Sequence, residues 1–208
     1  MKSINYKLFE LFVIFILIPV SFALPYSPWI KVGVGLTGFI YIIFVLLKVE
    51  KEQFKIASNL NWKRFCKQTL VKLLIIICLT TLFVWITNKE ALFNVLIIKP
   101  KLWIVILFIY SLFSVYPQEL VYRTFFFKRY EGLFKNSNQL IFLNAIVFSL
   151  GHIFFKNILV IILTFLGGLL FALSFKKTKS TVLVSIEHAI YGSWLFTVGM
   201  GAMLGFPE

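Results

Sequence analysis

Two side chains of opposite charge, Glu119 and Arg123, lie inside an apolar part of the sequence. Residues 116–123 fall between the apolar run 102–115 and an aromatic block at 125–127. Because Glu119 and Arg123 are four residues apart, a helix would place them on one face, where each offsets the other's charge. Ionisable residues at bilayer depth usually mark a functional site. The alternative is a buried ion pair that holds two helices together.

Few other residues could serve as an acid or a base, because the chain has no Asp, eight Glu and two His. Both imidazoles, His152 and His188, lie in apolar segments, and Glu187 precedes His188 directly. Carboxylates and imidazoles are the usual general acids and bases of enzymes. We therefore expect these groups to act together. Simpler interpretations stay open: His152 as a helix-contact residue that shares a face with Phe148, and Glu187 as a buried carboxyl held by Tyr191 or by another helix.

Composition indicates an integral membrane protein. Of the 208 residues, 60% are hydrophobic and only 14% are charged, and the mean hydropathy is +0.93. A soluble domain is nearer half apolar and a quarter charged. The net charge of +13 does not indicate nucleic-acid binding, because the basic residues fall between apolar spans rather than in a soluble domain. Cys66 and Cys78 have neither metal-ligand nor disulfide spacing.

The apolar segments predict an all-α, polytopic transmembrane helix bundle of about seven spans. We expect Pro117 to kink or restart the fourth span just before Glu119, since proline lacks a backbone N–H. Glycines 33, 35 and 38 in the second span and Gly167-Gly168 in the sixth are expected at close helix contacts. We expect Glu10 to reach the membrane interface. The predicted spans are residues 8–23, 32–47, 70–87, 102–127, 139–155, 157–175 and 181–204.

The loop charges predict the orientation. Fifteen Lys and Arg residues fall on one side of the predicted spans and five on the other, with Arg123 assigned to neither. By the positive-inside rule, the protein is a multi-pass cell-membrane protein with a cytoplasmic N-terminus and an external C-terminus. At 1.5 Å per helical residue, Glu119, His152 and His188 lie roughly 13, 18 and 12 Å from the cytoplasmic side. Residues 21–23 resemble a signal-peptide cleavage site, and cleavage there would leave the orientation of the other spans unchanged.

Three blocks of the sequence resemble the CPBP family, the CAAX-protease and bacteriocin-processing intramembrane endopeptidases, also called the ABI family. The family pattern is Glu-Glu-x-x-x-Arg, then Phe-x-x-x-His, then His-x-x-x-Asn, on separate transmembrane helices. This chain has Gln118-Glu119-x-x-x-Arg123, Phe148-x-x-x-His152 and His188-x-x-x-Gly192. The resemblance covers about residues 102–200. It implies that residues 1–101 are N-terminal transmembrane helices with a basic cytoplasmic loop and that 102–208 are the catalytic helices, both within one integral membrane domain without a domain boundary.

The resemblance implies hydrolysis of a peptide bond in a membrane-associated protein or peptide, by water that a glutamate and the second-block His152 activate. His188 of the last block would stabilise the oxyanion. A zinc site formed by Glu119, His152 and His188 is an open alternative. The zincin pattern His-Glu-x-x-His is absent from the sequence, so we favour a metal-free glutamate mechanism without a cofactor.

The sequence departs from the family pattern at two functional places, Gln118 and Gly192. We hypothesise that Glu119 takes over as the base and that Glu187 restores the missing acid, with Arg123 and Tyr191 supporting these carboxylates. Two other functions stay open. One is a non-catalytic membrane protein that binds a peptide or partner on the same fold. The other is a proton-linked transporter, which would be expected to contain inverted repeats that this sequence lacks.

Overall fold

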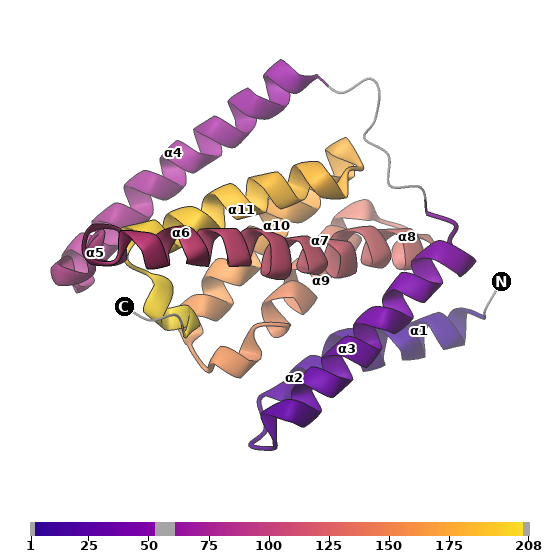
Figure 1. The fold of residues 1–208 in the computed structure, drawn as a ribbon. Coiled ribbons are helices and arrows are strands. Elements are labelled where there is room, and N and C mark those ends of the chain that lie inside the picture. Colours follow the sequence, from indigo (N-terminus) through magenta and orange to yellow (C-terminus); the bar gives the residue numbers. More distant parts are fainter. Residues whose placement is uncertain (1–2, 53–60, 206–208) are drawn as a thin grey trace. The chain divides into compact units, whose positions relative to one another are not determined.

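The structure is a computed structural model that describes residues 3–52 and 61–205, and these residues form helices and connections without any strand (Figure 1). The predicted all-α class is confirmed. Three α-helices precede residue 53: α1 (Ile4–Phe12), α2 (Ile18–Phe22) and α3 (Pro28–Phe44). Eight follow residue 60: α4 (Trp62–Thr87), α5 (Asn94–Ile98), α6 (Pro100–Ile109), α7 (Tyr116–Glu119), α8 (Phe126–Tyr130), α9 (Ser137–Leu150), α10 (Ile158–Thr178) and α11 (Thr181–Val198).

Short π- and 3₁₀-helical segments join many of these helices into longer runs. The π-helical segments are Val13–Leu17, Val45–Val49, Tyr110–Val115 and Leu120–Phe125. The 3₁₀ segments are Lys89–Ala91, Glu131–Leu133, Ile153–Phe155 and Gly201–Leu204.

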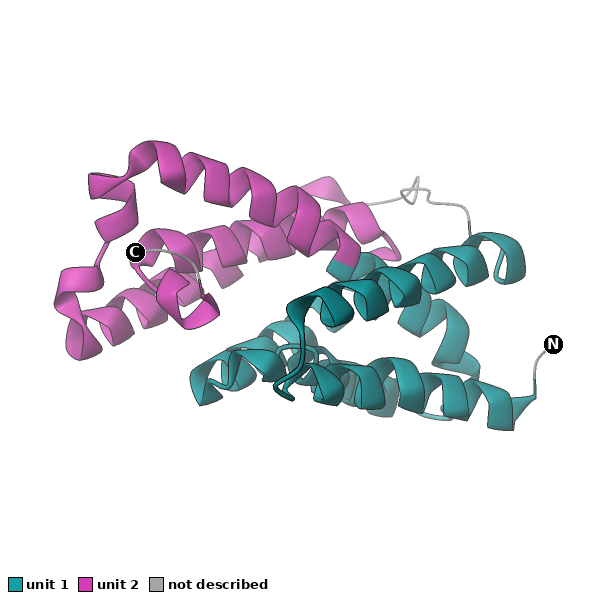
Figure 2. Cartoon of the chain, turned by 60° about the horizontal axis from the view of Figure 1, so that its bottom comes forward, with its two compact units in different colours: residues 1–55, 118–177 teal, residues 56–117, 178–208 magenta. Residues whose placement is uncertain are grey.

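Helix–helix contacts divide the chain into two compact units, each made of two separate stretches of sequence (Figure 2). Unit 1 comprises residues 1–55 and 118–177, and unit 2 comprises residues 56–117 and 178–208. The sequence analysis assigned residues 1–101 to N-terminal helices and residues 102–208 to catalytic helices. This assignment stays a prediction.

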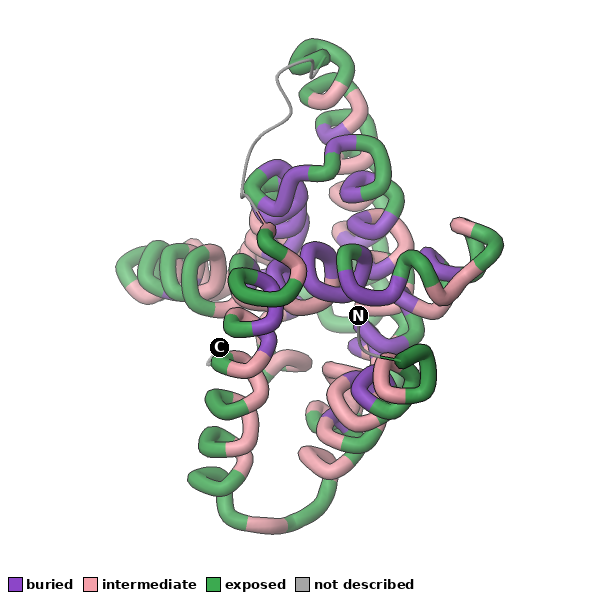
Figure 3. The backbone as a smooth tube through the Cα atoms, turned by 90° about the vertical axis from the view of Figure 1, so that its right-hand side faces the viewer, coloured by how far each residue is buried: buried purple, intermediate pink, exposed green. Residues whose placement is uncertain are grey.

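Six helical runs in the described residues are long and apolar enough to cross a membrane. They are Ile4–Phe22, Pro28–Val49, Trp62–Thr87, Pro100–Leu133, Ser137–Phe155 and Ile158–Thr178. Large apolar side chains such as Leu74, Leu79 and Ile86 of α4 are exposed, as lipid contact requires. The backbone coloured by burial shows exposed positions along most of the helices (Figure 3). The protein is therefore a multi-pass membrane protein. The predicted seventh span corresponds to α11, which is 18 residues long and contains Glu187 and His188.

Pro117 does not restart its helix. Residues 100–133 form one helical run, and Pro117 lies in α7 between two π-helical segments. A π-helical turn accommodates an extra residue without ending the helix, so the backbone around the proline changes its winding instead. The run does not restart before Glu119, and the expected kink at Pro117 stays a prediction.

Aromatic side chains form much of the core of unit 1. Phe15 is fully buried and packs edge-to-face against Phe126, with a centroid distance of 5.1 Å. The centroid of its ring also lies 6.0 Å from that of Tyr130 and 5.5 Å from that of Tyr122. Perpendicular ring pairs add stabilisation beyond the apolar area they bury. This cluster brings the π-helical segment after α1 against the helical run that carries the Glu119 stretch.

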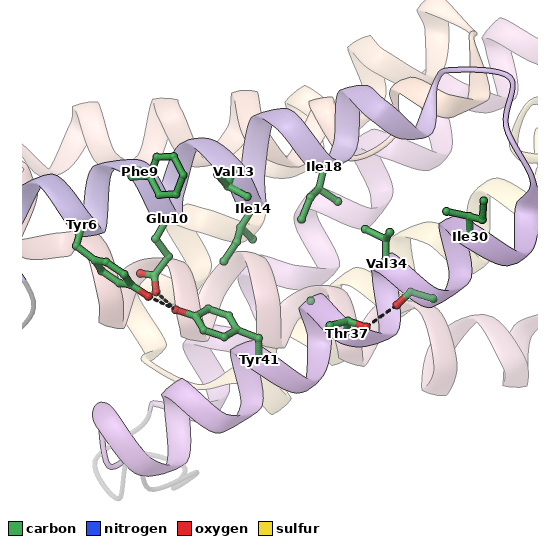
Figure 4. Close-up of a pocket in the computed structure, with 12 residues that line it drawn as sticks. Tyr6, Phe9, Glu10, Val13, Ile14, Ile18, Ile30, Val34, Thr37 and Tyr41 are labelled. Atoms are coloured by element: carbon green, nitrogen blue, oxygen red, sulfur yellow. Dashed lines mark hydrogen bonds between the residues drawn. The ribbon is translucent and has the colours of Figure 1, made fainter.

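Glu10 is buried among other side chains of the same unit, and its expected position at the membrane interface stays a prediction. Its carboxylate accepts a hydrogen bond from the Nε atom of Arg129 at 2.7 Å. The Nη1 atom of Arg129 donates to the carboxylate of Glu50, also at 2.7 Å. Glu10 also accepts a hydrogen bond from Tyr41, whose hydroxyl is 2.9 Å from that of Tyr6. Figure 4 shows the side chains of Tyr6, Glu10 and Tyr41 converging beside a cavity between the α1–α2 run and α3. The volume of this cavity is about 680 Å³. Arg129 lies far along the sequence, so no local pattern indicated this partner.

The close-packing role of Gly168 is confirmed, whereas that of the α3 glycines is wrong. A Cβ atom on Gly168 would lie 2.9 Å from the Cα of Ala145 in α9. No described atom lies within 4 Å of a Cβ built on Gly33, Gly35 or Gly38. Small residues permit a close helix approach but do not create one.

We predict that Gly168→Ala destabilises the protein by about 1–3 kcal/mol, because the added methyl group overpacks the contact with the α9 backbone. Gly35→Ala is the matched control. It adds the same methyl group where nothing described obstructs it, and it should be neutral or stabilise the helix by up to about 1 kcal/mol. Thermal unfolding in detergent measures both. Equal unfolding midpoints for the two variants would contradict the assigned α9–α10 contact.

Candidate functional site

The predicted pair of Glu119 and Arg123 forms inside unit 1. The Nε atom of Arg123 lies 3.2 Å from a carboxylate oxygen of Glu119, and both side chains are 0% exposed. Arg123 also donates to the side-chain oxygen of Asn144 at 2.7 Å. Its guanidinium lies 4.6 Å from the centroid of the Phe148 ring. These contacts hold the guanidinium in place, and Arg123 in turn restrains the carboxylate.

Asn144 is a site residue that the sequence analysis missed. It is fully buried on α9, and its amide donates to the backbone oxygen of Tyr122. A signal was available, because Asn144, Phe148 and His152 recur every four residues and thus share a helix face. An amide in an apolar span must find hydrogen-bond partners. Here it links α9 to the residues around Arg123.

His152 lies just after the C-terminus of α9 and keeps the predicted contact with Phe148. The ring centroids are 4.9 Å apart, and the Nδ1 atom is 2.8 Å from the backbone oxygen of Phe148. Since a carbonyl oxygen only accepts, Nδ1 carries the proton in this contact. In the neutral ring, Nε2 is then the nitrogen able to accept a proton. Gly151 does not leave open space, because a Cβ atom there would collide with the hydroxyl of Tyr122.

Glu187 is fully buried in unit 2, and its carboxylate joins α11 to α4. The hydroxyl of Tyr191 donates to it at 2.9 Å, which confirms the contact expected from their four-residue spacing. Lys72 of α4 also binds it, with a distance of 2.6 Å between Nζ and Oε1. The sequence analysis counted Lys72 only as a topology signal near the cytoplasm. Its pairing with Glu187 follows from tertiary contact and has no signal in the local sequence.

His188 is 7% exposed and lies on the same helix, one residue after Glu187. Its ring packs edge-to-face with that of Tyr110, with centroids 6.1 Å apart and planes at 81°. Gly192, one helical turn further, is also buried. Tyr110 comes from the π-helical segment after α6 and was not singled out from the sequence.

The predicted residues are distributed over both units. Unit 1 contains Gln118, Glu119, Arg123, Phe148 and His152, and unit 2 contains Glu187, His188, Tyr191 and Gly192. Gln118 is half-buried in α7 beside Glu119.

The donor set for a zinc site was tested against the same residues. Within residues 3–52 and 61–205, no three His, Cys, Asp or Glu side chains are grouped so that they could hold a metal ion. The predicted zinc ligands Glu119, His152 and His188 are therefore not grouped as a metal site in the described residues. We therefore derive no reaction step through a metal ion.

Carboxylates, cations and imidazoles lie among the apolar helices of this multi-pass membrane protein. The family model described as Rce1-like, type II CAAX prenyl endopeptidase Rce1-like, matches residues 100–194. This match agrees with the resemblance to the CPBP family that the three sequence blocks indicate. The match includes Glu119, Arg123, His152 and His188. No curated protein and no solved structure matches the chain.

We predict that Arg123→Met lowers the free energy of unfolding by about 3–5 kcal/mol, because it leaves the Glu119 carboxylate buried without a cation. The double variant Glu119→Gln/Arg123→Met should recover most of this loss, since it removes both charges. Lys128→Met is the control. Its pair with Glu52 is 2.9 Å long but partly exposed, so the loss should stay below about 1 kcal/mol. Thermal unfolding in detergent distinguishes these cases. A double variant less stable than Arg123→Met would show that the paired charges are not the cause.

Proposed function

We propose that this protein is an intramembrane endopeptidase that hydrolyses a peptide bond of a membrane-associated protein or peptide. The observation that carries the proposal is the match of residues 100–194 to the CAAX-type endopeptidase family, because that stretch contains every block with acid–base side chains. The exposed apolar helices support a substrate that reaches the protein through or beside the lipid bilayer.

In the proposed mechanism, Glu119 and His152 activate the attacking water. Arg123 supports this role because it pairs with the buried Glu119 carboxylate, and Asn144 and Phe148 hold Arg123 in place. The backbone contact of Nδ1 supports Nε2 of His152 as a proton acceptor. As water attacks the carbonyl carbon, its proton passes to this acid–base pair. The pair then returns the proton to the leaving amine as the C–N bond breaks.

In unit 2, His188 is proposed to donate a hydrogen bond to the oxyanion that develops on the carbonyl oxygen. Glu187 is held by Lys72 and Tyr191, which supports a second role as the link between α4 and α11. The hypothesis that Glu187 also replaces the missing acid of the family pattern stays a prediction. Glu187→Gln and Lys72→Met both break the pair between α4 and α11, so both should lower the unfolding midpoint. If the hypothesis is right, Glu187→Gln should lower the rate of cleavage more than Lys72→Met does.

The proposed orientation places the N-terminus in the cytoplasm and the C-terminus outside. The excess of Lys and Arg in alternate connections supports it, since short cytoplasmic loops are enriched in these residues. Under this orientation the acid–base groups act in the cytoplasmic half of the membrane.

A second function is favoured by one observation. Glu119, the proposed base, is fully buried and paired with Arg123, an arrangement that also suits a purely structural ion pair. In that case the protein binds a peptide or a partner without cutting it, and the departures at Gln118 and Gly192 are the traces of a lost activity.

Cleavage of a quenched fluorescent peptide library by the purified protein in detergent tests the proposal. We expect the wild type to cut, and we expect Glu119→Gln and His152→Ala to lower kcat by about 10²–10⁴-fold, the usual contribution of general acid–base catalysis. Glu52→Gln, which alters a partly exposed carboxylate, should cut as the wild type does.

The outcomes separate the alternatives. Absence of cutting by the wild type, with the unfolding transition intact, would favour the peptide-binding function. Loss of cutting with a chelator, followed by recovery with zinc, would contradict the metal-free mechanism. Full activity in Glu119→Gln would exclude Glu119 as the base.

A further inference from the structure

Tyr110 lies along one face of α11 beside the proposed oxyanion-binding histidine. His188, Gly192 and Phe196 recur every four residues, so they line one side of that helix. The Tyr110 ring is perpendicular to the His188 ring at a centroid distance of 6.1 Å, and it packs against the Phe196 ring at 4.8 Å. Gly192 lies between these two contacts along the helix. Tyr110 is thus held by aromatic packing on both sides of the glycine.

Gly192 is required for this placement. A Cβ atom built on Gly192 would collide with Tyr110, and the first atom it meets is the phenolic oxygen, followed by two carbons of the ring. The hydroxyl therefore lies directly over the α11 backbone, one helical turn from His188. Any larger residue at position 192 would push the hydroxyl away.

We propose that Tyr110 is a further catalytic residue, whose hydroxyl donates a hydrogen bond, together with His188, to the oxyanion formed during peptide hydrolysis. This inference rests on the proposed function. In the family pattern given above, the position of Gly192 is an Asn, which would project an amide donor from α11. Here a donor from the helical run of residues 100–133 occupies the space that the glycine opens. The departure at Gly192 then exchanges one donor for another and does not mark a lost activity.

The chemistry needs no additional reactant. As water adds to the carbonyl carbon, the C=O bond becomes a C–O⁻ bond, and its oxygen becomes a stronger hydrogen-bond acceptor. Tyr110 keeps its proton throughout, because the proton from water passes to Glu119 and His152. A donor fixed in advance by packing stabilises this charge more than it stabilises the neutral substrate, so it lowers the barrier.

Tyr110→Phe tests the inference, because it removes the hydroxyl and keeps the ring that contacts His188 and Phe196. For a peptide that the wild type cuts, we expect kcat to fall by about 10²–10³-fold, the loss typical of one oxyanion donor. KM and the unfolding midpoint should stay unchanged. Tyr116→Phe is the matched control, since Tyr116 lies on the same helical run but is 37% exposed. It should leave kcat unchanged.

An exchange of donors provides the second test. Gly192→Asn alone should lower both stability and kcat, because the new side chain collides with Tyr110. Tyr110→Ala combined with Gly192→Asn removes the collision and supplies an amide. This double variant should have a kcat about tenfold or more above that of Tyr110→Ala alone.

The results separate this inference from the proposed function. If the wild type cuts and Tyr110→Phe keeps its kcat within about twofold, Tyr110 does not stabilise the transition state and only this inference fails. A lower unfolding midpoint in Tyr110→Phe, without recovery of kcat in the double variant, would show a structural role and would also overturn it. If the wild type cuts no peptide, the proposed function and this inference fail together.

Discussion

A carboxylate inside an apolar helical protein must be paired, and this constraint determines much of the structure. Leaving one member of a buried pair alone costs several kcal/mol, a large part of the stability of a small protein. Each pair therefore fixes a local arrangement of helices. In unit 1, one pair ties α1 to α8 and another restrains the segment after α7; in unit 2, one pair ties α4 to α11. These pairs are Glu10–Arg129, Glu119–Arg123 and Lys72–Glu187.

The same constraint positions the groups proposed to act on a peptide bond. Arg123 offsets the buried charge of Glu119, while Asn144 and the Phe148 ring hold Arg123 from α9. His152 lies just after the end of α9, and its Nδ1 contacts the backbone oxygen of Phe148. In unit 2, the link between Glu187 and Lys72 secures α11, the helix that carries His188. Preorganised groups of this kind need no rearrangement when charge develops in the transition state.

Much of this arrangement follows from spacing in the sequence. The predicted helical spans correspond to helices, and three contacts between residues four apart are confirmed: Glu119–Arg123, Phe148–His152 and Glu187–Tyr191. Contacts between distant segments were not predicted, because several Lys, Arg and Tyr residues could supply each partner and the sequence alone does not choose among them. Three examples are the ion pairs Glu10–Arg129 and Lys72–Glu187 and the packing of Tyr110 against Gly192. The glycines of α3, which no described atom approaches closely, show the converse error, in which a permissive residue was taken for a contact.

The central claim, that Glu119 and His152 activate one water molecule as a unit, is tested most directly by a kinetic double-mutant cycle. It compares kcat/KM for the wild type, Glu119→Gln, His152→Ala and the double variant on one cleaved peptide. Residues that act as a unit are strongly non-additive, so the account predicts that the double variant loses little more activity than either single variant. Losses that multiply in the double variant would mean that the two residues act independently, and the account would then be wrong.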